Sequence, residues 1–186
     1  MNYASVGTLA LILHLIINKE LLKRDINNTG SAAMIRYKQF LYGVLGYYIT
    51  DILWGILYRM HIIPLVYADT VLYFALMVLT VVLWVRFVTE YLESKNRFAA
   101  LIRGIGWAIF LFTIVYLIIN FFIPIIFTFE GGEYTALLGR YITLILQVLL
   151  YLLASLYTFS WHRDPKAKRR SIIMPWAIPA LQWLYS

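Results

Sequence analysis

Cysteine is absent from this sequence, and charged residues are scarce. The chain of 186 residues contains no Cys, which excludes a disulfide bond, a zinc–thiolate site and a thiol nucleophile. Charged side chains make up 13% of the chain, against about 25% in a typical soluble domain, whereas 62% of its residues are hydrophobic. A soluble domain of this length cannot bury so much apolar surface, so the composition predicts a single membrane domain.

The common catalytic motifs are missing as well. Gly104 and Gly106 come nearest to a glycine-rich nucleotide loop, but a third glycine in register is lacking and an apolar run follows. No G-x-S-x-G or H-E-x-x-H motif occurs. His14 has no second histidine three or four residues away, so a metal site is unsupported. We therefore expect a chain that is not an enzyme and that uses no cofactor and no metal.

Long apolar runs cover most of the chain and predict an all-α, polytopic membrane helical bundle. A helix needs roughly 20 mostly apolar residues to cross the hydrocarbon layer. Five runs are expected to span, and a sixth of 16 residues with two prolines is expected to be partial or truncated. The expected helices, all within a single transmembrane domain at 1–186, are 3–22, 39–58, 68–92, 104–127, 137–161 and the partial 171–186.

The basic residues are distributed unevenly between these runs. The net charge of +7 invites a nucleic-acid partner, but short basic clusters between apolar runs are typical of cytoplasmic loops. Most of the 16 Lys and Arg fall in three links, at residues 19–38, 93–103 and 162–170. The positive-inside rule places these links in the cytoplasm, so the N-terminus is expected outside and nucleic acid is not an expected partner.

Polar side chains inside the apolar runs are the candidates for a functional site, because each is costly to bury in a bilayer. They are His14, Asp51, Asp69, Arg86, Asn120, Arg140 and Gln147. At about 1.5 Å per residue, most of them fall in the outer half of the membrane. We expect an outward-facing ligand site that takes a small ligand or a proton. Its expected members are Asp51, Asp69, Arg140, Asn120 and Gln147.

A purely structural interpretation stands beside this one. Asp51 or Asp69 can form an ion pair with Arg140 on a neighbouring helix, and Asn120 and Gln147 can bridge helices. One face of the second run carries an aromatic stripe that also contains an acid, by i, i+4, i+7 and i+11 spacing. Its members are Tyr47, Asp51, Trp54 and Tyr58.

Two segments resemble a known family. The string LYGVLGYYITDILWGILYRMHIIPLVYADTVLYFALMVLTVVLWVRFVTEYLE, residues 41–93, resembles the N-terminal membrane region of diguanylate cyclases (GGDEF proteins) and hybrid histidine kinases of gut Clostridia. GRYITLILQVLLYLLASLYT, residues 139–158, resembles a later helix of the same region. The resemblance implies a sensor or input module in a bacterial cytoplasmic membrane. No GGDEF motif or kinase core follows, so we expect a fragment or a shortened reading frame without its output domain.

Two other functions remain open. A small transport component, such as the vitamin-binding subunit of an energy-coupling-factor transporter, has a similar length and about six helices. A non-functional, truncated membrane remnant is the third interpretation. The expected partners are the lipid bilayer, a second copy of the chain in a homodimer, and the unidentified small ligand or proton.

Overall fold

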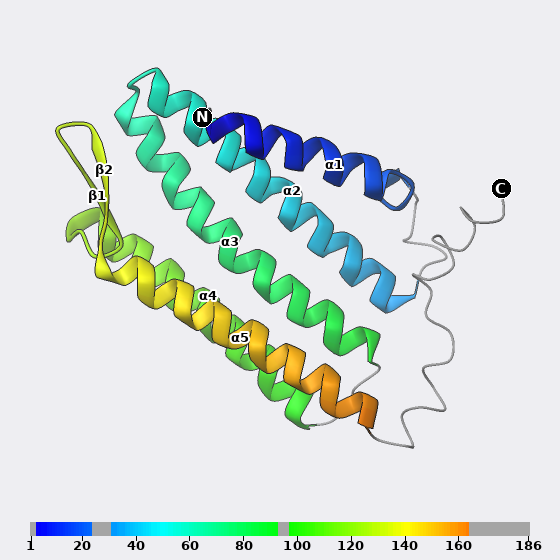
Figure 1. Cartoon of the computed structure of the whole chain (residues 1–186). Helices are drawn as coiled ribbons and strands as arrows, with labels where there is room; N and C mark the ends of the chain where they lie inside the picture. Colours follow the sequence, from blue (N-terminus) through cyan, green and yellow to red (C-terminus); the bar gives the residue numbers. More distant parts are fainter. Residues whose placement is uncertain (1–2, 24–30, 93–96, 164–186) are drawn as a thin grey trace.

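The chain folds into a bundle of long helices with one small β-hairpin (Figure 1). The structure is a computed structural model that describes residues 3–23, 31–92 and 97–163. Each of its five helices is long and apolar enough to cross a membrane, which confirms the predicted all-α, multi-pass bundle. The helices are α1 (Tyr3–Lys23), α2 (Ala32–Arg59), α3 (Ile63–Tyr91), α4 (Arg97–Phe122) and α5 (Leu138–Arg163).

Consecutive helices pack against each other, and α3 lies at the centre. It contacts α2 on one side and both α4 and α5 on the other, whereas α1 packs on α2 at the edge of the bundle (Figure 1). The apolar window of α3 is 33% buried, and that of α1 is only 6% buried. The low burial of α1 means that it is held to the bundle chiefly by its contact with α2.

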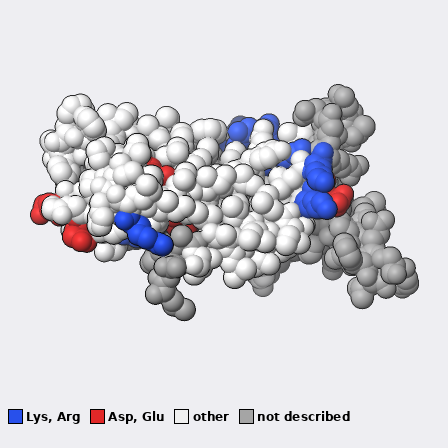
Figure 2. Space-filling model, turned by 90° about the horizontal axis from the view of Figure 1, so that it is seen from above, with Lys and Arg blue, Asp and Glu red and all other residues white. Residues whose placement is uncertain are grey.

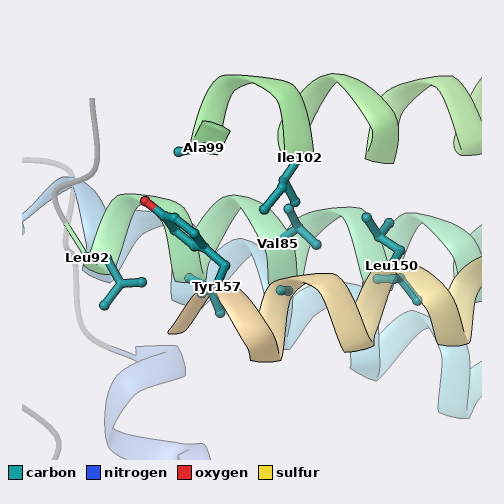
Figure 3. Close-up of a cluster of buried hydrophobic side chains, with 9 residues drawn as sticks. Val85, Leu92, Ala99, Ile102, Leu150 and Tyr157 are labelled. Carbon is teal, nitrogen blue, oxygen red and sulfur yellow. The ribbon is translucent and has the colours of Figure 1, made fainter. Parts of the chain in front are cut away.

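Two apolar clusters hold α3 to its neighbours, the first joining it to α4 and α5 and the second to α4 and the hairpin. The first cluster lies toward the end where α3 finishes and α4 begins, and Figure 3 shows its side chains meeting from three helices. Its labelled members are Val85 of α3, Leu92 directly after α3, Ala99 and Ile102 of α4, and Leu150 and Tyr157 of α5. The second cluster lies at the opposite end, around Phe74, Leu117 and Phe127.

The hairpin was not predicted as sheet. Strands β1 (Phe127–Glu130) and β2 (Glu133–Ala136) pair antiparallel across a two-residue turn. Gly131 and Gly132 occupy that turn with φ of 61° and 87°, a conformation that side chains other than glycine rarely adopt. The hairpin lies at the link between the fourth and fifth expected helices, 104–127 and 137–161, for which no strand was expected.

Four helix bounds differ from the sequence-based ones by several residues, among them the start of α4, which lies at Arg97 rather than 104. Helix α2 begins at Ala32 rather than 39, because the Ser31 hydroxyl caps it by accepting a 3.3 Å hydrogen bond from the Met34 N–H. Helix α3 begins at Ile63, since Pro64 lies in its first turn, where a missing N–H costs nothing. Helix α4 ends at Phe122 instead of 127. The predicted partial helix at 171–186 lies outside the described residues.

Charge separates along the bundle. Figure 2 shows Lys and Arg mostly toward one end and acidic side chains at the opposite tip, with some acidic side chains also at the basic end and in the middle and a basic group in the half of the acidic tip. The hairpin residues Glu130 and Glu133 belong to the acidic tip, whereas Lys23 at the end of α1 and Arg36 near the start of α2 belong to the basic end. The helix arrangement therefore agrees with the charge asymmetry that predicts an external N-terminus.

Candidate functional site

The predicted aromatic stripe of α2 faces α3 and the hairpin. The hydroxyls of Tyr47 and Tyr73 share a 2.8 Å hydrogen bond, and the Trp54 indole N–H donates to Thr70 Oγ1 at 3.1 Å. Tyr58 stacks on Trp54 with ring centroids 4.9 Å apart. Polar contacts thus line the α2–α3 interface over the half of the bundle nearest the hairpin.

Asp69 is a buried acid of α3 beside these polar contacts of the α2–α3 interface. Its side chain is 7% exposed, and its Oδ2 atom has no hydrogen-bond partner among the described residues. Asp51 lies within electrostatic range of Asp69. Two like charges so close, with one of them out of water, are costly unless a proton or a cation joins them.

Asp51 also touches the peripheral helix. A Cβ atom added to Gly7 of α1 would lie 2.7 Å from Asp51 Oδ2 and 3.2 Å from the Ile52 side chain. Only a residue without a side chain lets α1 come this close to the carboxylate. Helix α1 is therefore positioned to respond when the charge or the orientation of Asp51 changes.

Arg140 does not make the ion pair that the structural interpretation expected. Its Nη1 donates to the Tyr134 hydroxyl at 3.3 Å, and its guanidinium carbon lies 5.8 Å from the centre of the Tyr134 ring. Burial raises the pKa of the Tyr134 phenol, and the nearby Arg140 charge opposes that rise. The described residues include no salt bridge from Arg140 to Asp51 or Asp69. The Arg140 guanidinium nevertheless lies in the same region as the Asp51 carboxylate, because Tyr73 is within electrostatic range of both.

The hairpin closes this region at the end of the bundle where α2 ends and α3 begins. Tyr58 donates a 2.7 Å hydrogen bond to Glu133 Oε2, and Trp54 meets the Tyr134 ring edge to face with centroids 6.0 Å apart. Figure 1 shows the hairpin at the end of the bundle, between the α4–α5 end and the α2–α3 turn.

The sequence alone did not point to three residues of this region, Thr70, Tyr73 and Tyr134. The first two follow Asp69 at i+1 and i+4, a spacing that places Tyr73 on the same helix face.

Asn120 bonds to the segment that follows its helix and to the Tyr67 hydroxyl of α3 at 3.4 Å, whereas Gln147 bonds within its own helix. Asn120 is 2% exposed, and its Oδ1 accepts from the backbone N–H groups of Ile125, Ile126 and Phe127 at 2.7, 2.6 and 3.3 Å. Gln147 is buried and donates to the Thr143 carbonyl of its own helix at 3.1 Å. The structure therefore brings Asp51, Asp69 and Arg140 into one region, and gives Asn120 a structural task at the end of α4.

His14 of α1 packs against α2. Its ring lies edge-on to Tyr48 of α2, with centroids 6.0 Å apart. No cluster of three His, Cys, Asp or Glu side chains able to hold a metal ion occurs in the described part of the chain.

Comparison with protein-family models, curated proteins and solved structures finds no match to this chain. The resemblance to sensor membrane regions therefore stays a prediction from sequence.

Proposed function

We propose that this chain is a membrane-embedded sensor or input module of a bacterial signalling protein in the cytoplasmic membrane. Its signal is a proton or a small cation received by Asp51 and Asp69 at the outer end of the bundle. The observation that carries this proposal is the buried Asp69 carboxylate: its Oδ2 has no hydrogen-bond partner among the described residues, and Asp51 lies within electrostatic range. A group with no structural partner in such a place is a functional candidate by default.

The charge balance of the region favours a positively charged signal. Arg140 is the cation nearest these acids in the sequence-predicted site, and it is directed at the hydroxyl of Tyr134 rather than at a carboxylate. One proton or one small cation would relieve the repulsion between Asp51 and Asp69. The tyrosine and tryptophan rings at the α2–α3 interface also favour a cation, because the face of an aromatic ring attracts positive charge.

The packing offers a route for the response. Asp51 lies against Gly7 of α1, and α1 is the least buried of the helices. A change in the charge of Asp51 alters the contact that holds α1 to α2. Both helices run from this region to the basic end, where an output domain in the cytoplasm would receive the change (Figure 1).

The sensing proposal is tested by fusing the chain in frame to a diguanylate cyclase output domain and measuring product while external pH and cations are varied. Wild type should respond. Asp51→Asn removes one of the two charges and should abolish the response or shift its midpoint, whereas Arg140→Gln should shift the midpoint alone. Both variants should insert as well as wild type, because asparagine has the size of aspartate and glutamine is an uncharged polar side chain that fits in the space of arginine.

The control for this experiment is Glu130→Gln, which removes an exposed acid from the same end of the molecule. It should respond as wild type does. If Asp51→Asn and Arg140→Gln also respond normally, the site proposal is wrong and these residues only pack. A loss of inserted protein in Asp51→Asn, with the remaining protein signalling normally, would likewise assign Asp51 a structural role.

The proposed orientation gives a separate prediction. The chain has no cysteine, so a single introduced thiol is the only target for a thiol reagent. Glu130→Cys, at the tip of the hairpin, should react with a membrane-impermeant maleimide on intact cells. Lys23→Cys, at the opposite end of the bundle, should react only after the cells are permeabilised. Labelling of Lys23→Cys but not Glu130→Cys on intact cells would reverse the topology.

A further inference from the structure

Three arginines lie at matching depth near the basic end of the bundle. Arg36 follows the start of α2, Arg86 precedes the end of α3, and Arg103 follows the start of α4. At about 1.5 Å per residue, each lies roughly 6–9 Å inside its helix end. Because α3 packs between α2 and α4, the three side chains come from adjacent helices. Arg86 lies within electrostatic range of both other arginines.

These charges are not neutralised within the described residues. Arg86 lies over the Trp107 ring of α4, with its guanidinium carbon 5.9 Å from the ring centre. Arg36 donates to the neutral Gln39 side chain at 3.1 Å. Glu90 is the one acid whose charge acts on Arg86, and none of the three arginines forms a salt bridge with it in the part of the chain described. Three cations therefore repel one another at the edge of the hydrocarbon layer.

The alternative to a shared site is that each arginine extends its guanidinium group separately into the water at the membrane surface. The Trp107 ring instead holds Arg86 between α3 and α4, and the exposed side chains below it on α4 form an apolar stripe. The stripe consists of Trp107, Leu111, Val115 and Ile118. A bound molecule with an anionic head and an apolar tail would match both features.

We propose that Arg36, Arg86 and Arg103 form a binding site for the phosphate of an anionic lipid headgroup, with an acyl chain lying along Trp107 and Leu111. Guanidinium groups suit this chemistry, since their planar donors bind phosphate oxygens in pairs. Basic pockets between transmembrane helices on the cytoplasmic side are typical places for such headgroups. The lipid site does not depend on the sensing proposed for Asp51 and Asp69, and it lies at the other end of the bundle.

The test uses the full chain, purified in a zwitterionic detergent, titrated with phosphatidylglycerol or phosphatidylcholine. Lipid binding is followed by native mass spectrometry, and stability by thermal unfolding. Phosphatidylglycerol should bind and raise the unfolding temperature, and phosphatidylcholine should not. Arg86→Gln should weaken phosphatidylglycerol binding about fivefold, and Arg36→Gln with Arg103→Gln about 25-fold, at about one kcal/mol for each basic residue.

The matched control is Arg97→Gln, which removes an exposed arginine from the first residue of α4 at the same end. It should leave binding unchanged. Equal binding of the two lipids, or equal losses in Arg97→Gln and Arg86→Gln, would overturn the site. Competition by millimolar inorganic phosphate would show that the oxyanion alone binds, whereas lipid binding without such competition would show that the acyl chain is needed. If Arg86→Gln does not fold, Arg103→Gln decides, because Arg103 has no hydrogen bond among the described residues.

Discussion

Substitution of Asn120 by alanine is expected to destabilise the protein by about 2–5 kcal/mol, at about 1–3 kcal/mol for each buried polar group left without a partner. The Asn120 carboxamide oxygen accepts from three successive backbone N–H groups, at Ile125, Ile126 and Phe127. Its Nδ2 donates to the Phe127 carbonyl at 3.1 Å. Alanine removes all of these bonds where Ile126 and Phe127 are fully buried.

The loss should be read from the unfolding midpoint in a denaturing detergent titration. The control is Thr113→Val in the same helix. Thr113 is equally buried, but its hydroxyl only donates to the Ile109 carbonyl of the preceding turn, and valine has nearly the same shape. This control should cost less than about 1 kcal/mol. Equal losses in the two variants would mean that the 125–127 segment does not depend on Asn120.

Substitution of Gly139 by alanine should destabilise the hairpin junction by about 1–3 kcal/mol, the usual cost of overpacking. An added Cβ would lie 2.7 Å from the Ile125 carbonyl oxygen and 2.9 Å from the Ile125 Cγ2. The first of these atoms is backbone and cannot rotate away, and it also accepts a 2.9 Å hydrogen bond from the Gly139 N–H. The start of α5 must therefore move away from Ile125.

That movement should also reach the candidate site. Arg140 directly follows Gly139, so its contact with Tyr134 should weaken and the fused output should respond at a shifted midpoint. Gly104→Ala is the matched control, since an added Cβ there meets nothing within 4 Å and the residue lies inside α4. It should stabilise the helix by about 0.5–1 kcal/mol. A Gly139→Ala variant as stable as Gly104→Ala would contradict the close packing at Ile125.

The amino-acid sequence alone determined the membrane bundle. Long apolar runs leave the backbone no partner in lipid except its own helix, so run length and composition suffice to predict five spanning helices. The i, i+7, i+11 spacing likewise placed Tyr47, Trp54 and Tyr58 on one face of α2, and the structure shows all three in contacts across that face. Helical periodicity depends only on residues close in the chain, so the sequence alone predicts which side chains share a helix face.

Only the tertiary structure decided what the polar residues contact. The Asn120 side chain accepts hydrogen bonds from the backbone at 125–127, because α4 ends at Phe122 and the chain then folds back toward it. Helix periodicity does not predict this turn. Arg140 meets Tyr134 because the hairpin carries that ring over the start of α5. Asp69, by contrast, keeps one carboxylate oxygen without a hydrogen-bond partner in the part of the chain that the structure describes. Partner choice depends on the positions of segments far apart in the chain, and these positions follow from packing rather than from local spacing.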